Sequence, residues 1–167
     1  MVTWTALEEE LRHLAGSVPD PELPVLTLEE LGVLRGVEVL APGRVTVRLT
    51  PTYTGCPAIE AMSMDIERVL LDHGMTEVSV VTVLSPAWST DDISAEGRRK
   101  LTEFGIAPPR PHDAASPAGP VPLTLSVRCP HCGSTDTELL SRFSSTACKA
   151  LHRCVACREP FDHFKEL

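Results

Sequence analysis

Two Cys-x-x-Cys motifs near the C-terminus constrain the fold of this chain more than any other feature. Cys129-Pro-His-Cys132 and Cys154-Val-Ala-Cys157 are separated by 21 residues. Two residues between cysteines let a tight turn present both sulfurs to one ion, and four thiolates complete a tetrahedron. We therefore predict that residues 123–167 form a zinc ribbon, a domain of short strands that folds through its metal.

Four cysteine ligands leave a zinc ion no open position for water, which favours a structural site over a hydrolytic one. Iron, alone or in an iron–sulfur cluster, is the competing occupant because it accepts the same ligands. Cys148 is a surplus thiol that could replace a ligand, stay free or simply pack. Three histidines are weaker alternative ligands, since four cysteines suffice: His131, His152 and His163.

The charge of the chain is −8, and it is concentrated before the cysteine motifs. Residues 1–107 hold 17 acidic and 8 basic side chains, whereas residues 126–167 hold 5 and 6. Such an acidic first part repels phosphate backbones. Aromatic residues make up only 4% of the chain, which leaves little material for stacking on bases. We therefore expect no nucleic-acid partner.

The beginning of the chain lacks the basic segment and apolar core of a secretion signal. No apolar run approaches the roughly 20 residues that a membrane-spanning helix needs. We therefore expect a cytoplasmic protein with no membrane partner. In a reducing compartment, paired cysteines bind metal more often than they form disulfides.

The first 106 residues predict an α/β domain of the α+β kind. A capping box of Thr5 and Glu8 would begin the first helix, and Thr27 with Glu30 a second, short one ending at Gly32. A strand, a helix and a strand in succession predict a right-handed crossover between parallel strands. The result is a small mixed three-stranded sheet with helices. The expected helices are 6–14, 57–73 and 94–104, and the expected strands are 37–40, 44–50 and 78–84.

Residues 107–122 form a predicted linker between this domain and the ribbon. Six of these sixteen residues are proline, and no apolar period is present. Such a segment cannot bury a core of its own. The predicted domains are therefore residues 1–106 and 123–167.

A lone cysteine, Cys56, lies where the second strand gives way to a helix. Pro57 favours the first helical position, which would place Cys56 at the N-cap. Free amides and the helix dipole would then stabilise a thiolate and lower the pKa of the thiol. This pattern predicts a reactive or metal-binding cysteine; the alternative is a small buried cysteine that caps a helix.

The stretches "DPELPVLTLEELGVLRGVEV", "LTPTYTGCPA" and "GRRKLTEFGIAPP" resemble the domain of SufT-like iron–sulfur assembly factors. The tail "SRFSSTACKALHRCVACREPFDHFK" is similar to one branch, the PaaD proteins, which are D subunits of phenylacetyl-CoA epoxidase (ring 1,2-epoxidase) systems. The resemblance spans nearly the whole chain except the linker. One departure is Asp92, in Thr-Asp-Asp-Ile, where the family usually has tryptophan.

The resemblance implies an accessory, non-enzymatic role in phenylacetate catabolism, assisting iron or iron–sulfur cofactor assembly of the multicomponent epoxidase. Implied partners are the epoxidase subunits or iron–sulfur assembly proteins, and a homodimer is an open arrangement. Cys56 would hold iron or a cluster transiently. The matching motif positions are Asp20, Pro21, Glu22, Thr54, Gly55, Cys56 and Pro57.

Two carboxylates fit this role in physical terms. Asp20 and Glu22 lie in a proline-rigidified loop, from which they could approach Cys56 and share an iron site. The alternative is that Asp20 caps a turn and Glu22 is solvated.

Two rival functions remain open from the sequence. One is a thiol enzyme with Cys56 as nucleophile, for which His73 or His13 would have to approach as base. The other is a zinc ribbon that binds nucleic acid, against which the acidic first domain and the few aromatics weigh.

Overall fold

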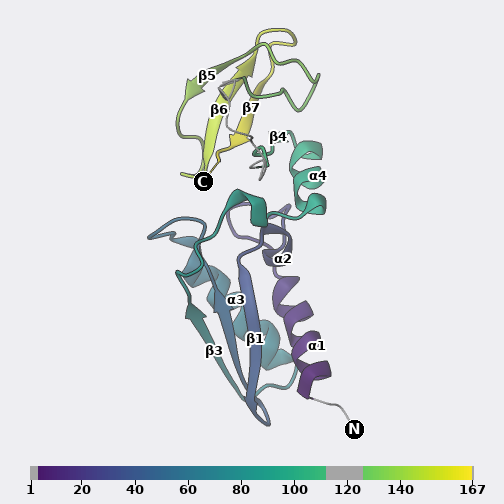
Figure 1. Ribbon diagram of the computed structural model, residues 1–167, viewed down its shortest axis with the longest axis vertical. Helices are drawn as coiled ribbons and strands as arrows, with labels where there is room; N and C mark the ends of the chain where they lie inside the picture. The colour runs from purple at the N-terminus through teal and green to yellow at the C-terminus, as the bar shows by residue number, and fades with distance from the viewer. Residues whose placement is uncertain (1–3, 112–125, 167) are drawn as a thin grey trace, which may run out of the picture. The chain divides into compact units, whose positions relative to one another are not determined.

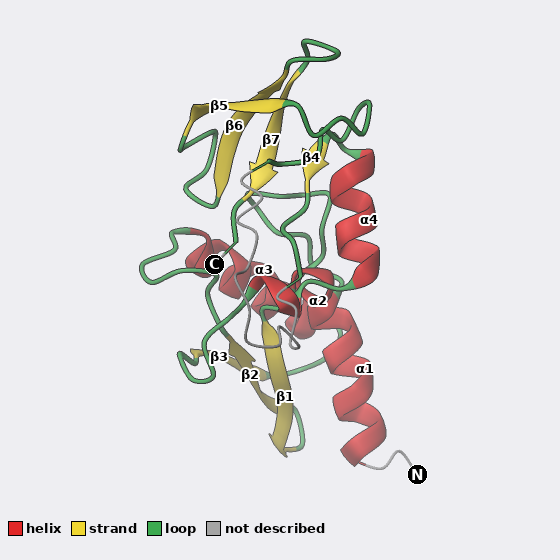
Figure 2. Cartoon of the chain, turned by 45° about the horizontal axis from the view of Figure 1, so that its top comes forward, coloured by secondary structure: helices red, strands yellow, loops and turns green. Residues whose placement is uncertain are grey.

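The computed structural model describes residues 4–111 and 126–166. The chain forms two compact units, residues 1–97 and 98–166 (Figure 1). A three-stranded sheet lies in the first unit and a four-stranded sheet in the second (Figure 2). The prediction of an α+β fold followed by a separate ribbon is therefore confirmed.

The first unit is built on a mixed sheet with the strand order β1-β2-β3. β1 and β2 form an antiparallel hairpin, and β2 and β3 are parallel and joined through α3. The predicted crossover is confirmed. None of the described helices is both long and apolar enough to cross a bilayer. In chain order the elements are α1 (Trp4–Gly16), α2 (Leu28–Leu31), β1 (Leu34–Ala41), β2 (Arg44–Leu49), α3 (Ala58–Asp72), β3 (Glu77–Thr82) and the 3₁₀ turn η1 (Thr90–Asp92), followed by α4 (Ala95–Glu103), which runs into the second unit.

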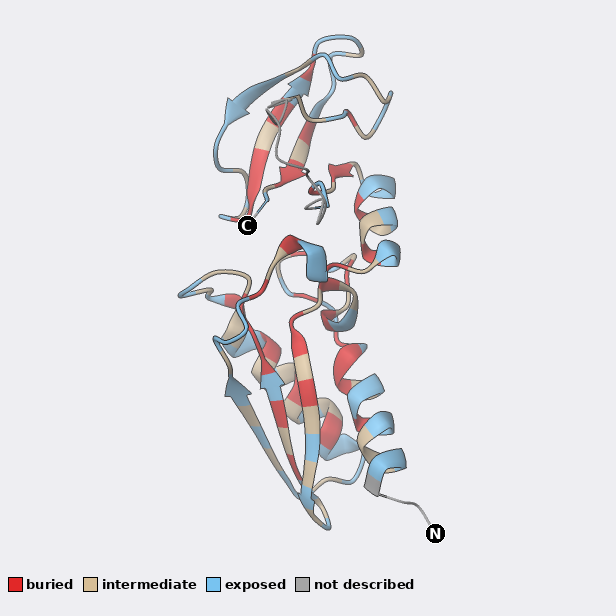
Figure 3. Cartoon of the chain, in the orientation of Figure 1, coloured by how far each residue is buried: buried red, intermediate tan, exposed pale blue. Residues whose placement is uncertain are grey.

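The core of the first unit lies between one face of the sheet and the helices α1 and α3. Alternate residues of β2 are buried, and the residues between them are not (Figure 3). Val47 and Leu49 are fully buried, as are Leu11 of α1 and Ile66 of α3. On the other face, ion pairs join the outward arginines to neighbouring strands: Arg44–Glu77 and Arg48–Glu38.

Of the two predicted capping boxes, the first differs from the expectation. α1 begins at Trp4, so Thr5 lies inside the helix and not at the N-cap position that the predicted capping box requires. The Glu8 carboxylate instead accepts the backbone N–H of Val39 at 2.9 Å, which ties α1 to the outer strand β1. The second predicted capping box is confirmed, because Thr27 and Glu30 exchange side-chain-to-backbone hydrogen bonds of 3.0 and 3.2 Å.

The second unit is a ribbon sheet with the strand order β4-β7-β6-β5. Its strands are β4 (Ile106–Ala107), β5 (Thr137–Ser141), β6 (Lys149–Cys154) and β7 (Pro160–Phe164). β4 is parallel to β7, and the other pairs are antiparallel.

β4 makes the unit boundary differ from the expected one after residue 106. Ile106 and Ala107 are buried apolar residues that pair with Asp162 and His163 of β7, so residues 98–111 belong to the second unit. The remainder of the predicted linker, residues 112–122, lies outside the described residues.

Gly32 offers a test of the packing in the first unit. Its φ is +78°, and a Cβ there would lie 2.3 Å from the carbonyl oxygen of Asp92. Gly74 also has a positive φ, of +99°, but a Cβ there would meet nothing within 4 Å. We expect Gly74→Ala to lower the free energy of unfolding by about 1 kcal/mol through backbone strain. Gly32→Ala should lower it by about 3 kcal/mol, since overpacking adds to the strain.

Urea unfolding followed by tryptophan fluorescence measures this difference in the first unit, because both tryptophans, Trp4 and Trp88, lie in it. An equal loss of unfolding free energy in the two variants would contradict the close approach of Gly32 to the η1 turn.

Candidate functional site

The four cysteines of the two motifs converge on one point in the second unit. Their Sγ atoms all lie within 4.8 Å of one another. The distance is 3.8 Å from Cys129 to Cys157 and 3.6 Å from Cys132 to Cys154. Zinc–sulfur bonds of about 2.3 Å place tetrahedral sulfurs about 3.8 Å apart. The side chains present therefore fit one tetrahedral metal ion.

The two turns that carry these cysteines have the same backbone design. In each, the residue after the second cysteine has a left-handed conformation, with φ of +77° at Gly133 and +67° at Arg158. In each, the first cysteine donates its backbone N–H to the carbonyl five residues later: Cys129 to Ser134 at 2.9 Å and Cys154 to Glu159 at 3.0 Å. Such closed turns hold both sulfurs of a motif on the same side of the backbone.

A backbone amide prepares one of the four thiols, Cys154, for a cation, whereas burial opposes the loss of its proton. The N–H of Cys157 lies 3.5 Å from the Sγ of Cys154 and contributes most to lowering the pKa of that thiol, to about 7. Cys129 and Cys154 are buried against Phe161 and Ala107. Metal binding would displace the remaining thiol protons and join the two turns through four bonds.

The surplus thiol and the histidines stand outside this group. Cys148 is buried, with its Sγ 3.1 Å from the hydroxyl oxygen of Thr146. Among the described residues, the converging group of metal-ligating side chains contains neither Cys148 nor any histidine. His152 and His163 are instead buried in the ribbon, with ring centroids 5.4 Å apart.

Cys56 lies in the loop that connects β2 to α3. Pro57, not Cys56, occupies the N-cap of α3, so the predicted cap position was wrong by one residue. The turn before the helix closes through the Cys56 N–H, which donates to the Tyr53 carbonyl at 3.3 Å. The Cys56 sulfur nevertheless accepts a hydrogen bond from the backbone N–H of Ala58, in the first helical turn.

The pKa of the Cys56 thiol is raised, whereas the sequence predicted that it would fall. Burial is the main cause, and the negative charges of Glu22 and Asp20 add to it. The hydrogen bonds from Ala58 and from the Tyr53 side chain act in the opposite direction but do not overcome burial. Tyr53 is a contact that spacing and motif matching missed.

The two carboxylates have different local roles. Asp20 is buried, and its Oδ1 accepts the backbone N–H groups of Glu22 at 2.9 Å and Leu23 at 2.7 Å. This contact is the turn-capping alternative, and burial raises the pKa of Asp20. Both carboxylates act electrostatically on Cys56, yet none of the three residues belongs to a converging ligand group in the described ranges.

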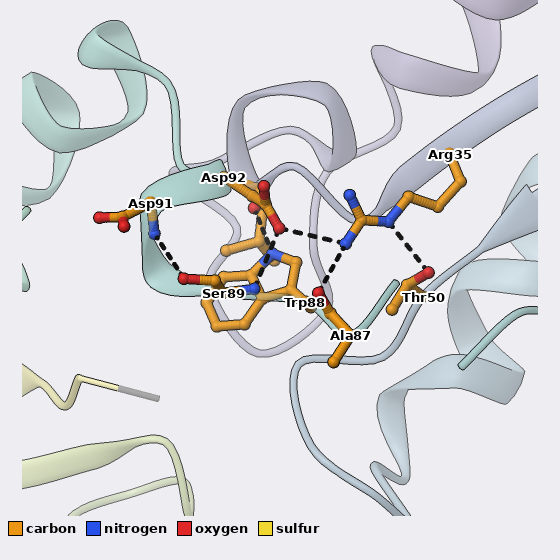
Figure 4. A network of polar contacts seen from close by, with 8 residues as sticks. Arg35, Thr50, Ala87, Trp88, Ser89, Asp91 and Asp92 are labelled. Atoms are coloured by element: carbon orange, nitrogen blue, oxygen red, sulfur yellow. Dashed lines mark hydrogen bonds and ion pairs between the residues drawn. The ribbon is translucent and has the colours of Figure 1, made fainter. Parts of the chain in front are cut away.

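A polar network joins the start of the Cys56 loop to the loop that follows β3 (Figure 4). Arg35 donates from Nε to the hydroxyl of Thr50 at 3.0 Å and from Nη2 to Asp92 at 3.1 Å. Its Nη2 also lies 3.4 Å from the Ala87 carbonyl oxygen. Arg35 therefore ties together both walls of a hollow of about 240 Å³, one formed by residues 50–54 and the other including Leu84, Ala87 and Trp88.

Asp92, which departs from the family pattern, is a member of this network. Its Oδ2 also accepts the backbone N–H of Ser89 at 3.0 Å, so the carboxylate caps η1 as well as pairing with Arg35. No local signal marks this pair, because 57 residues separate its members.

Comparison with known proteins covers both units. Residues 8–84 match the family model described as iron–sulfur cluster assembly protein, and residues 114–165 match the PaaD zinc beta ribbon domain. The first match contains Asp20, Glu22 and Cys56. A crystal structure of a domain of unknown function, DUF59, from Bacillus anthracis superposes with a TM-score of 0.55 and 27% identity, covering 59% of this chain and 93% of that one.

Two relatives extend the match. The "Fe-S protein maturation auxiliary factor" of Porphyromonas gingivalis is 36% identical over 98 residues, which are 56% of this chain and 90% of that protein. The D subunit of a putative 1,2-phenylacetyl-CoA epoxidase from Escherichia coli K12 is 47% identical over 156 residues, which are 93% of this chain and 91% of that protein. The chain therefore belongs to the PaaD family, in which an iron–sulfur assembly domain is followed by a zinc ribbon.

Proposed function

We propose that this protein is a non-catalytic accessory factor that assists iron or iron–sulfur cofactor assembly in a phenylacetyl-CoA epoxidase system. One observation carries the proposal. Within the segment matched by the iron–sulfur assembly model, the negative charges of Glu22 and Asp20 raise the pKa of the half-buried Cys56 thiol. A soft thiolate beside hard carboxylates is a donor set that suits iron.

Cys56 would hold its cargo transiently, because its donor set is incomplete. Asp20 already uses one oxygen to cap its turn, and no converging group of three ligands surrounds Cys56 in the described part of the chain. The remaining coordination positions would be filled by the donor or by the client protein. Partners of this kind are epoxidase subunits or iron–sulfur assembly proteins, as the names of the relatives suggest.

The ribbon would hold zinc as a structural ion. Its four sulfurs match the tetrahedral spacing, and four thiolates leave no position for a reacting water. In this proposal the ribbon contributes a rigid surface for the client, and the cargo is carried by the first unit.

The rival functions receive less support. A thiolate nucleophile needs a lowered pKa or a nearby base, whereas the pKa of Cys56 is raised. His73 is held by Glu10, with 2.9 Å from Nε2 to the carboxylate oxygen, and no histidine is among the groups that shift the pKa of Cys56. The acidic charge of the first unit weighs against nucleic acid.

The first prediction concerns metal content after purification without oxygen. We expect Cys56→Ala to lose iron and to keep zinc, because it removes the only sulfur in the proposed cargo site. Cys148→Ala is the matched control, since Cys148 is a buried thiol outside both donor sets. Elemental analysis for zinc, iron and sulfide per chain measures the result.

The same two variants should differ in how well they activate the epoxidase. Cys56→Ala should fail to activate the epoxidase, and Cys148→Ala should succeed. Iron retained at the wild-type level in Cys56→Ala, together with full activation, would exclude Cys56 as the cargo ligand.

The raised pKa of Cys56 predicts how iron binding depends on pH. Below that pKa the thiol is protonated, so iron(II) must displace one proton to bind the sulfur. The apparent affinity should therefore rise about tenfold per pH unit between about pH 6 and pH 8. Titration of the zinc-loaded chain with iron(II) under anaerobic conditions measures this slope, which Cys56→Ala should abolish. A flat profile in the wild type would mean that iron binds without the thiolate.

Removal of one ribbon ligand should unfold the second unit alone. We expect Cys132→Ser to lower zinc from one ion to none per chain and to remove hydrogen-exchange protection from β5, β6 and β7. Tryptophan fluorescence should remain native, because both tryptophans lie in the first unit. Cys148→Ser should keep the zinc, and full protection of these strands without zinc would refute a metal-dependent ribbon.

A further inference from the structure

A pocket of about 510 Å³ lies within the second unit, beside the first cysteine turn. Its wall is formed by the end of α4, by β4 and the residues after it, by residues 126–130 and by β7. This volume falls in the range of small-molecule sites, which extends from about 300 to about 1,000 Å³. Neither the zinc site nor the proposed cargo site needs such a space.

The chemistry of the wall is apolar with a cationic rim. Ala107, Pro108 and Val127 supply apolar surface, and Arg110 and Arg128 supply two guanidinium groups. No carboxylate side chain lines the pocket in the described ranges. Arg128 Nη1 donates to the Gly133 carbonyl at 2.9 Å, a contact that occupies one of five donors.

His163 is a further polar residue in the wall of the pocket. Its side chain lines the pocket and is 8% exposed. In the described part of the chain its ring makes an edge contact with His152 and lies 3.9 Å from a Glu166 oxygen, which is longer than a hydrogen bond. The ring makes no hydrogen bond to another described residue, so it can donate to a polar group that enters the pocket.

We propose that this pocket binds an organic carboxylate that carries a short apolar body. The carboxylate would accept hydrogen bonds from Arg128 and from the His163 ring, and the apolar body would lie against β4 and Val127. The volume exceeds what one carboxylate fills, which is why an acid with a body of several carbon atoms fits. The acid could be a free small molecule or the side chain or C-terminus of a partner protein.

A purely structural role for Arg128 explains fewer of these observations. Arg128 could serve only to offset the charge of the thiolates through its place beside the first cysteine turn. That role would account for neither the unfilled volume nor the His163 ring in its wall.

The test uses the full-length, zinc-loaded chain with isotope-labelled histidine. The imidazole C–H signals of His163 are followed by NMR during titration with hexanoate, with the uncharged hexanamide and with a short glutamate-rich peptide. We expect hexanoate to give saturable shifts and hexanamide to bind about tenfold more weakly or not at all, because charge-assisted hydrogen bonds are lost. Saturation by the peptide and not by hexanoate would identify a protein as the source of the carboxylate.

Matched variants tie the shifts to the pocket. Arg128→Gln should weaken binding about tenfold. Arg153→Gln should leave it unchanged, because Arg153 is a ribbon arginine that pairs with Glu138 and does not line the pocket. If Arg128→Gln loses its zinc, a second variant replaces it. Thr102 lines the pocket from an exposed position of α4, so the indole of Thr102→Trp should fill the pocket. This variant should keep its zinc and lose hexanoate binding.

The proposal is overturned if neither hexanoate nor the peptide gives saturable shifts, or if hexanamide binds as well as hexanoate. It is equally overturned if Thr102→Trp, with its zinc bound, still binds hexanoate normally. None of these results tests iron binding at Cys56. Failure of the pocket proposal would therefore leave the proposed function unaffected, and the reverse also holds.

Discussion

Convergence of four thiols on one point is the constraint on which the second unit depends. Its core of buried residues around the cysteines is small, with Phe161 and Ala107 as the neighbours of Cys129 and Cys154. Such a small core supplies little stability without a cross-link such as a metal ion. The four metal–sulfur bonds would supply that cross-link. They would join the two cysteine turns, of which the second connects β6 to β7. β4 pairs with β7 and lines the pocket beside the first cysteine turn, so both features require a folded ribbon.

The two candidate metal sites differ in the way that a resident ion and a cargo should differ. The ribbon offers four matched sulfurs on closed turns, so an ion bound there has every coordination position filled by the chain. Cys56 offers one sulfur with two carboxylates nearby, one of them occupied in capping its turn. A complete set retains its ion, whereas an incomplete set must exchange ligands with another protein. A carrier requires the second kind.

The sequence was a good guide where a feature is local and a poor one where it depends on distant contacts. The succession of strand, helix and strand predicted the mixed sheet, and the spacing of the cysteines predicted the ribbon site, because the order of elements and the spacing of ligands can be read locally. The pairing of Ile106 with Asp162 was missed, since a two-residue strand has no period and its partner lies 56 positions away. The pKa of Cys56 was predicted in the wrong direction for a related reason. The helix dipole is readable from a Cys-Pro pair, but burial and the charges of Asp20 and Glu22 come from tertiary packing.

The raised pKa of Cys56 has a consequence for the proposed role of this thiol as an iron ligand. The thiolate is the form that oxidants attack, so a protonated, half-buried thiol is protected while it is empty. An arriving cation reverses the balance, because it displaces the proton and is attracted by the same two carboxylates that raised the pKa. Asp20 and Glu22 thus favour the thiol without metal and the thiolate with it. They act on Cys56 in both states through charge, even where they do not bind the ion directly.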